Sequence, residues 1–242
     1  MIKVNHILIV FVCIALLYTL TKSQPIVYKH TIHEHLFKNN TYKIYEIVDL
    51  FTPSECELVR ESAKPSLTRS KTMSKNNAVS DIRTSSNTFL HNDRVGSTMS
   101  VLLERIDKLT QTLSGKPKTF QEPLQVVKYE PNQYYKEHYD CCVPFNSDIC
   151  REDRKHHGLR HSTLLIYINE VEEGGYTDFP LVNHSFKPII GSAIFFFNLL
   201  KDETTFHPLS KHAGLPPTKG EKWVCNKWIR TQPFIYWFMI YD

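Results

Sequence analysis

The sequence lacks internal repeats, low-complexity tracts and linkers rich in proline or glycine. These absences exclude repeat architectures and leave no boundary for a second domain. A length of 242 residues suits one well-filled domain. Excess charge is also small, since 29 basic and 25 acidic residues are interspersed and give a net charge of +4. We therefore expect no nucleic-acid partner.

Cysteine is scarce, and most of it is not arranged for metal binding. Outside Cys13 near the N-terminus there are five cysteines: Cys56, Cys141, Cys142, Cys150 and Cys225. The adjacent pair lacks the two-to-four-residue separation typical of thiolate zinc sites, so such a site is not expected. An odd count leaves one cysteine unpaired if the others all form bridges within the chain. Because residues 143–148 are turn-like, Cys142 and Cys150 are a candidate disulfide.

Residues 1–24 have the pattern of a signal peptide or signal anchor. Lys3 precedes an apolar run over Ile7–Leu20, and polar residues resume at Thr21. Thr21 and Ser23 are small enough for a cleavage site, but extending the apolar run back to Val4 brings it to about 18 residues, near the lower limit for a membrane span. In both cases we expect the remaining chain in the lumen of the endoplasmic reticulum. The glycosylation sequons at Asn39 and Asn183 are compatible with this compartment.

Two metal-capable side chains stand two residues apart at His138 and Asp140. On a β-strand, positions i and i+2 face the same side, so one strand could present both. A distant histidine would complete a set of two histidines and one carboxylate, which leaves three iron positions open for a co-substrate and O₂. His212 is our candidate. A surface pair in a polar strand is the alternative interpretation of His138 and Asp140.

Lys222 follows His212 by ten residues across the turn-rich segment 214–220. A hairpin centred near Pro217 would set His212 and Lys222 opposite each other, with the cation beside the metal. Lys227 is the rival cation, and Lys222 could also be a charge on an edge strand. A denser group of histidines (His156, His157 and His161) lies in or beside the charged segment 151–160. We expect that segment to be a flexible surface loop with solvated histidines.

The remaining patterns predict a mainly β, α+β fold with supporting N-terminal helices. Thr52-Pro53-Ser54-Glu55 has the pattern of a capping box and predicts a helix to Ala63. Apolar residues at three- and four-residue steps predict a second helix over Asp93–Leu113. Strands are expected over Leu164–Ile168, Ala193–Asn198, Trp223–Trp228 and Phe234–Tyr241. Helices followed by many short strands favour a jelly roll that encloses the site.

The order of these motifs resembles the catalytic domain of prolyl 4-hydroxylases, which are Fe(II)- and 2-oxoglutarate-dependent dioxygenases. The matching segments are 124–129, 133–135 with the His138/Asp140 pair, 163–169, 174–180, 191–196, 212–214, and 222–223 with 226–229. Residues 83–86 match the N-terminal region of the family. The resemblance implies a double-stranded β-helix, a catalytic domain over residues 25–242 with a core at about 120–235, and the short single-domain type of enzyme.

The resemblance also implies a role for each candidate residue. His138, Asp140 and His212 would be the metal ligands and the catalytic residues. Lys222, Tyr129 and, as a weaker candidate, Thr163 would bind 2-oxoglutarate. The residues expected around the peptide are Glu122, Tyr135, Arg160 and Trp228. The implied cofactors and co-substrates are Fe(II), 2-oxoglutarate, O₂ and L-ascorbate, and the products are 4-hydroxyproline, succinate and CO₂.

The implied substrate is a proline-rich or collagen-like polypeptide, and the sequence does not separate these two. Short family members are commonly held by an uncleaved signal anchor, which favours a single-pass protein anchored in the endoplasmic reticulum. The chain lacks the peptide-binding domain of the large tetrameric enzymes, so we expect a monomer or a weak homo-oligomer. It also has Leu215-Pro216-Pro217 where animal collagen-modifying members usually have cysteine and valine around the proline.

Three other functions are compatible with some of these residues. A lysyl hydroxylase would use the same ligands, but that group holds 2-oxoglutarate with arginine. A catalytically silent module that binds proline peptides would be marked by an incomplete ligand set. A zinc hydrolase could use the three ligands with a water molecule, but it would not need Lys222 or Tyr129.

Overall fold

The computed structural model describes residues 30–70, 81–91 and 96–234. The leader over residues 1–24 lies outside these ranges, as does the predicted strand Phe234–Tyr241 except for its first residue. No helix in the described part of the chain is long and apolar enough to cross a membrane.

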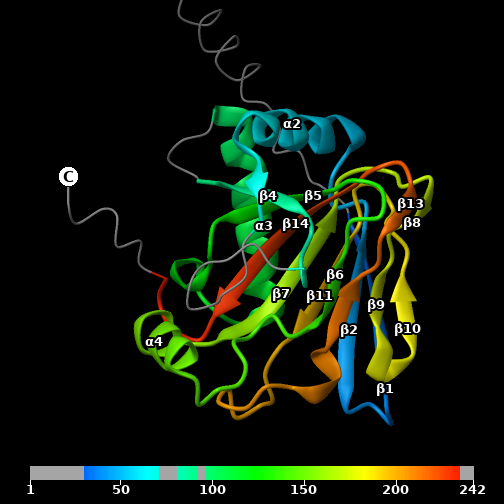
Figure 1. Ribbon diagram of the computed structural model, residues 1–242. Coiled ribbons are helices and arrows are strands. Elements are labelled where there is room, and N and C mark those ends of the chain that lie inside the picture. The colour runs from blue at the N-terminus through cyan, green and yellow to red at the C-terminus, as the bar shows by residue number, and fades with distance from the viewer. Residues whose placement is uncertain (1–29, 71–80, 92–95, 235–242) are drawn as a thin grey trace, which may run out of the picture.

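A large antiparallel sheet of eight strands forms the centre of the molecule (Figure 1). Its spatial order is β1-β2-β11-β7-β14-β5-β4-β3. The bounds are β1 Thr31–Phe37, β2 Tyr42–Val48, β3 Thr68–Arg69, β4 Ser86–Leu90, β5 Leu124–Tyr129, β7 Arg160–Tyr167, β11 Ala193–Phe197 and β14 Lys222–Arg230. The strands predicted over Leu164–Ile168, Ala193–Asn198 and Trp223–Trp228 are confirmed in β7, β11 and β14, except that Ile168 and Asn198 lie one residue beyond the ends of β7 and β11.

A second sheet of four strands, in the order β10-β9-β12-β6, faces the large one. Its strands are β6 Tyr135–His138, β9 Thr177–Phe179, β10 His184–Phe186 and β12 His212–Gly214. Two further short strands, β8 Glu173–Gly174 and β13 Pro217–Lys219, pair with each other. An apolar cluster with members from both sheets, including Phe179, Phe186 and Phe196, fills the space between them. This arrangement confirms the predicted mainly β jelly roll, and its sheets do not close into a barrel.

Two helices cover the other face of the large sheet. α2 (Pro53–Ala63) begins with the predicted capping box, in which Thr52 and Glu55 exchange side-chain and backbone hydrogen bonds. α3 spans Ser97–Ser114, so its start differs from the predicted Asp93. Gly96 is its N-cap, and residues 92–95 lie outside the described ranges. Both helices pack on apolar side chains of the large sheet, and this cluster is the main core.

The charged segment after the metal-binding motif is a helix, so the prediction of a flexible loop over residues 151–160 is wrong. α4 spans Asp148–His157, and its N-cap is Ser147, whose hydroxyl accepts a hydrogen bond from the Cys150 amide. The predicted disulfide Cys142–Cys150 is confirmed and ties the first turn of α4 to the chain just beyond Asp140. Four short 3-10 helices complete the described elements: η1 Lys64–Ser66, η3 Lys118–Phe120, η4 Pro180–Val182 and η5 Pro208–Ser210.

The two-residue alternation of β14 decides which side chains reach the space between the sheets. Trp223, Cys225 and Ile229 belong to the core under the helices. Lys222, Val224, Asn226 and Trp228 line a cavity on the opposite face. Both faces of the strand are therefore covered, which explains its nearly continuous burial despite three basic residues.

The predicted hairpin between His212 and Lys222 is wrong. His212 lies on β12 in the small sheet, and Lys222 begins β14 in the large sheet. Between them, β13 pairs with β8, so the chain crosses from one sheet to the other. The cross-strand partner of His212 is His138, whereas that of Lys222 is Tyr129.

Candidate metal and co-substrate site

His138, Asp140 and His212 meet at one place between the sheets. One ligand atom from each residue lies within 4.8 Å of the others. The Nε2 atom of His138 is 3.7 Å from Asp140 Oδ1, and the Nε2 atom of His212 is 3.9 Å from Asp140 Oδ2. β6 ends at His138, so Asp140 follows the strand rather than lying within it. Its carboxylate still points to the same side as His138.

Hydrogen bonds fix the orientation of both imidazoles. The Nδ1 atom of His138 lies 2.8 Å from the Lys136 carbonyl oxygen, and that of His212 lies 2.9 Å from the Ser210 carbonyl oxygen. An Nδ1–H that donates to each carbonyl leaves Nε2 unprotonated and turned toward Asp140. This is the arrangement in which histidine usually binds a metal. Phe179 and Phe196 pack against the His212 ring and limit its movement.

The protonation of these groups also suits metal binding. Burial, with a contribution from His138, lowers the pKa of His212 to about 4, so its imidazole is neutral near pH 7. Burial alone would raise the pKa of Asp140, but interactions with the neighbouring His212, His138 and Arg160 side chains hold it well below its usual range. Neutral imidazoles and an ionised carboxylate are the forms that metals bind. Two histidines and one carboxylate fit Fe(II) with open positions.

Lys222 is a buried cation on the same cavity. Its side chain is only 1% exposed, and it has no carboxylate partner in the described ranges. The ammonium donates long hydrogen bonds to the Tyr176 carbonyl oxygen at 3.3 Å and to Thr177 Oγ1 at 3.4 Å. Burial lowers the pKa of Lys222 to about 7. A carboxylate from a ligand would compensate this charge, so the residues fit a dicarboxylate such as 2-oxoglutarate.

Tyr129 and Thr177 complete the surroundings of Lys222. The ammonium lies 5.7 Å from the centre of the Tyr129 ring, and both residues line the cavity. Burial raises the pKa of Tyr129, so its hydroxyl stays protonated and able to donate. Thr177 was not among the sequence candidates. The signal that could have identified it is its place two residues after the Gly174-Gly175 turn in the motif 174–180.

Thr163, the weaker candidate for the co-substrate pocket, contacts a metal ligand instead. Its hydroxyl donates to Asp140 Oδ2 at 2.6 Å and accepts from Asn198 Nδ2 at 2.9 Å. Thr163 is fully buried and is not among the side chains that line the cavity. The alternation of β7 turns it toward Asp140, which explains the difference from the expectation.

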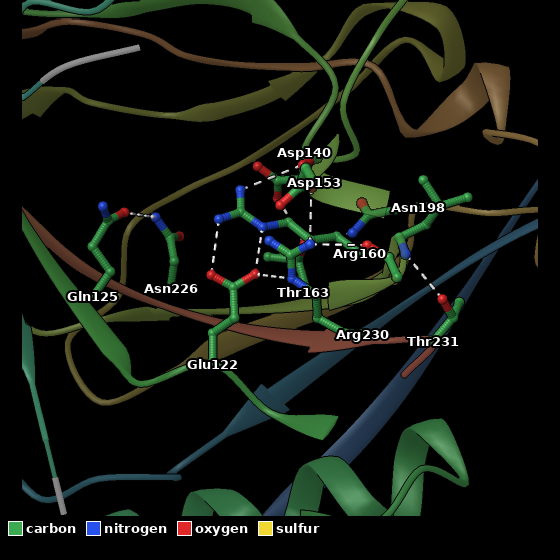
Figure 2. A network of polar contacts seen from close by, with 12 residues as sticks. Glu122, Gln125, Asp140, Asp153, Arg160, Thr163, Asn198, Asn226, Arg230 and Thr231 are labelled. Atoms are coloured by element: carbon green, nitrogen blue, oxygen red, sulfur yellow. Dashed lines mark hydrogen bonds and ion pairs between the residues drawn. The ribbon is translucent and has the colours of Figure 1, made fainter. Parts of the chain in front are cut away.

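Of the four residues expected around the peptide, three line the cavity and one lies behind it. Tyr135 stacks on His138 with ring centres 3.4 Å apart. The Arg160 guanidinium lies 3.5 Å from the centre of the Trp228 ring, and both side chains border the cavity. Glu122 is buried and holds Arg160 through two hydrogen bonds of 2.7 and 3.0 Å (Figure 2). Its carboxylate does not line the cavity.

Glu122 also binds a second arginine. The Nε atom of Arg230 donates to Glu122 Oε1 at 2.6 Å, and one terminal nitrogen of Arg230 reaches Asp153 on α4 at 2.9 Å (Figure 2). Burial opposes ionisation of Glu122, but the two arginines lower its pKa to about 2. This network ties α4 to the cavity wall, and sequence reasoning did not identify Arg230 or Asp153.

The cavity has a volume of about 960 Å³ and continues from the metal ligands toward β3 and β4. Arg69, Arg83 and Phe89 line that extension. Arg83 lies over the Tyr135 ring at 5.0 Å and donates to Gln125 Oε1 at 3.2 Å. The sequence marked Arg83 only as part of a matching motif, without a role.

The alternative cation and the other candidate histidines do not line this cavity. Lys227 is buried on the helix side of β14, where its ammonium is 2.9 Å from Asp107. His156 lies on α4 beside Glu152. His161 is not solvated as expected but 7% exposed, and burial lowers its pKa to about 4. Within the described ranges, none of the histidines His156, His157 and His161 belongs to a metal-binding cluster.

Comparisons with known proteins agree with this geometry. The profile of the 2OG-Fe(II) oxygenase superfamily matches residues 124–230. Prolyl 4-hydroxylase 1 of Arabidopsis thaliana is 33% identical over 206 residues, which cover 78% of this chain and 69% of the relative. A prolyl 4-hydroxylase-like protein of Acanthamoeba polyphaga mimivirus is 47% identical over 113 residues, and this match spans 46% of that protein's length.

A solved structure gives the same fold. The viral collagen prolyl hydroxylase of Paramecium Bursaria Chlorella virus-1, determined as a 2OG complex, superposes with a TM-score of 0.61. Its sequence is 29% identical, and the match covers 78% of this chain and 96% of the viral one. Together with the two histidines, the carboxylate and the buried lysine on one cavity, these matches show that the chain belongs to the prolyl 4-hydroxylase family of 2OG-Fe(II) oxygenases.

Proposed function

We propose that this chain hydroxylates C4 of peptidyl proline in proline-rich or collagen-like polypeptides, with oxidation of 2-oxoglutarate to succinate and CO₂. One oxygen atom of O₂ enters the proline and the other enters succinate. The observation that carries the proposal is the single cavity bordered by a complete ligand set, a buried lysine without a carboxylate partner in the described ranges, and an aromatic wall.

The metal site has a defined role in this reaction. Fe(II) bound to His138, Asp140 and His212 would supply the O₂ chemistry that couples decarboxylation to hydroxylation. The protein's own task is to hold the ligands in one orientation. The hydrogen bonds between the two imidazoles and backbone carbonyls do this, and they turn both Nε2 atoms toward Asp140.

Lys222 and its neighbours would select the co-substrate. The ammonium binds the far carboxylate of 2-oxoglutarate, and the hydroxyls of Tyr129 and Thr177 can donate to the same group. A charge-assisted hydrogen bond of this kind contributes roughly 1.5 to 3 kcal/mol. Burial of Lys222 reduces the competition of solvent for its ammonium.

The peptide would lie along the wall formed by Tyr135, Arg160 and Trp228. A proline ring packs well on aromatic faces, and an extended polyproline II backbone leaves its carbonyl groups available to Arg160. Glu122 holds that guanidinium over the Trp228 ring. The extension of the cavity toward Arg83 and Phe89 gives room for residues beside the target proline.

Succinate release from 2-oxoglutarate, measured with Fe(II) and ascorbate, tests the proposal. A (Pro-Pro-Gly)-type peptide and a polyproline peptide should each be compared with a reaction lacking peptide. We expect stimulated succinate release and a mass gain of one oxygen on proline in at least one peptide. Oxygen on lysine alone would favour a lysyl hydroxylase. Failure to consume 2-oxoglutarate with or without peptide would favour a silent peptide-binding module or a zinc hydrolase.

L-ascorbate belongs to the proposal as a reductant that would keep iron bound at the site in the Fe(II) state during turnover without peptide. Omitting it should therefore shorten the linear phase of the reaction while the initial rate stays unchanged. A linear phase of equal length without ascorbate would remove it from the cofactors.

We further propose that residues 1–24 direct the chain to the endoplasmic reticulum, where they act as a signal peptide or a signal anchor for a catalytic domain over residues 25–242. Asn39 and Asn183 support this compartment, since both are exposed and lie at the surface. Translation with microsomes should give a protease-protected product whose mass falls after glycosidase treatment. Retention in the membrane after alkaline extraction would identify an anchor.

We propose a monomer or weak homo-oligomer, which light scattering of the catalytic domain would test.

A further inference from the structure

Asp140 accepts a side-chain hydrogen bond from a residue outside the candidate ligand set. Its Oδ2 atom accepts from the hydroxyl of Thr163 at 2.6 Å, and this hydroxyl accepts from Asn198 Nδ2 at 2.9 Å (Figure 2). Thr163 lies on β7, and Asn198 directly follows β11. The three residues form a chain of hydrogen bonds that begins in the large sheet and ends on a candidate metal ligand.

The direction of both hydrogen bonds is fixed by the chemistry of the groups. An amide nitrogen can only donate, so Thr163 accepts from Asn198 and has its single proton left for Asp140. The opposite orientation of the Asn198 amide would draw the threonine proton away. The hydroxyl and the ionised carboxylate would then be two acceptors only 2.6 Å apart. The observed orientation is therefore the one that the Asp140 contact demands.

Burial makes this contact strong. Thr163 and Asn198 are both 0% exposed, so water does not compete for either group. The backbone of Asn198 is held on both sides, by its amide donating to the His161 carbonyl oxygen and by its carbonyl accepting from the His207 amide, each at 2.8 Å. A neutral donor to a carboxylate in dry surroundings gives a charge-assisted hydrogen bond. The hydroxyl and the amide behind Asp140 are thus shielded from solvent.

We propose that Thr163 and Asn198 are positioning residues that restrict Asp140 to binding the metal through one carboxylate oxygen. The inference rests on the proposed metal site. With Oδ2 bonded to Thr163, Oδ1 is the oxygen left without a hydrogen-bond donor from these two residues. A carboxylate that bound through both oxygens would take a fourth coordination position. Two histidines and one oxygen leave the three positions that 2-oxoglutarate and O₂ require.

Metal titration of the purified catalytic domain tests this role without any turnover. We expect Thr163→Val, which keeps the shape of the side chain, to weaken Co(II) binding roughly 10- to 100-fold. Thr163→Ser keeps the hydroxyl and should restore most of the affinity. The Co(II) absorption spectrum of the valine variant should also change, because a second carboxylate oxygen becomes available. Unchanged affinity and spectrum in Thr163→Val would overturn the proposal.

Asn198 is tested through its dependence on Thr163. Asn198→Leu should weaken Co(II) binding, since the threonine proton is no longer directed to Asp140. The double variant Thr163→Val/Asn198→Leu should bind no more weakly than Thr163→Val, because Asn198 acts only through Thr163. Fully additive losses would contradict the relay. The double variant also removes both polar partners together, so it keeps the test available if a single variant fails to fold.

Two controls separate this inference from the proposed function. Thr177→Val removes a hydroxyl from the same cavity beside Lys222, and it should leave Co(II) affinity unchanged. His212→Ala should lose Co(II) binding. If His212→Ala binds Co(II) normally, the proposed metal site fails. If His212→Ala loses the metal while Thr163→Val keeps it, the metal site stands and only the positioning role fails.

Discussion

Tyr129 and Lys222 are direct cross-strand partners on β5 and β14, with the lysine nitrogen 5.7 Å from the centre of the tyrosine ring. Both side chains face the cavity because their strands alternate in the same phase. The pair places a cation and a hydroxyl donor together, and both side chains are buried. A site of this kind stabilises a bound carboxylate but is costly when it is empty.

Lys222→Met should strongly raise the apparent KM for 2-oxoglutarate. The variant leaves a buried carboxylate of the bound co-substrate without its partner, which costs about 3 to 5 kcal/mol. This corresponds to a KM increase of roughly 100-fold or more. Metal affinity should not change, since the lysine is not a ligand. Steady-state kinetics with varied 2-oxoglutarate and a Co(II) titration measure the two effects.

Lys227→Met is the matched control for this prediction. Lys227 lies on the same strand, but its ammonium pairs with the buried carboxylate of Asp107 on the helix side. Breaking that pair should lower the melting temperature without changing the KM for 2-oxoglutarate. A large increase of the KM for 2-oxoglutarate in Lys227→Met, with none in Lys222→Met, would show that Lys227 binds the co-substrate instead.

The affinity for 2-oxoglutarate should fall as pH rises above neutrality. Burial lowers the pKa of Lys222 to about 7, so the free protein loses the ammonium charge above this value. Binding then requires uptake of a proton, and affinity should decrease about tenfold per pH unit. Calorimetry at saturating Co(II), in buffers of different ionisation enthalpy, measures both affinity and proton uptake. Lys222→Arg should bind with little pH dependence, because a guanidinium stays charged.

The sequence predicted which residues form the site better than how the chain brings them together. Residue types and spacing identified His138, Asp140, His212 and Lys222, because metal and carboxylate chemistry restricts the possible side chains. The assumed hairpin failed because two short strands, β12 and β13, pair with different partners far away in the sequence. Turn residues indicate that the chain bends but do not identify the strand with which the next segment pairs.

The contacts behind the cavity wall could not be predicted from the sequence either. Thr163 and Thr177 are both threonines on strands, and only the register of β7 and β9 decides which one faces Asp140 and which one faces Lys222. The charged residues of α4 suggested a loop, since they lack an apolar stripe. The disulfide to Cys142 and the ion pair between Asp153 and Arg230 hold this helix instead. Tertiary contacts of this kind override local propensity.

Replacement of each metal ligand should abolish hydroxylation. His138→Ala, Asp140→Ala and His212→Ala each leave two ligands, which cannot hold iron in a site with three open positions. Co(II) titration should show the loss of binding directly. His207→Ala is the control, because its ring packs on Tyr42 away from the ligand cluster. Retained activity in His212→Ala together with its loss in His207→Ala would identify a different distal ligand.

Glu122→Gln should reduce stability at neutral pH but flatten its acid dependence. The two arginines lower the pKa of Glu122 to about 2, although burial opposes this. A depressed carboxyl pKa stabilises the fold fully above the ordinary value near 4.5, and this contribution is lost as pH falls toward 2. It amounts to roughly 3 kcal/mol. Urea unfolding at pH 7, 4 and 3 should show a smaller stability loss in Glu122→Gln than in the wild type. Equal acid dependence of the two proteins would contradict this role.

Trp228→Ala should weaken peptide binding while leaving 2-oxoglutarate turnover without peptide intact. The ring supplies a wall of the cavity and lies 3.5 Å from the Arg160 guanidinium, and it is not one of the three candidate metal ligands. Its loss removes contact area for the proline ring and releases the guanidinium. We expect the KM for a polyproline peptide to rise at least tenfold, with an unchanged KM for 2-oxoglutarate.

Trp223→Phe, on the helix side of the same strand, should leave both values unchanged. Equal losses of peptide-dependent and peptide-independent turnover in Trp228→Ala would mean that the ring supports the metal site rather than the substrate.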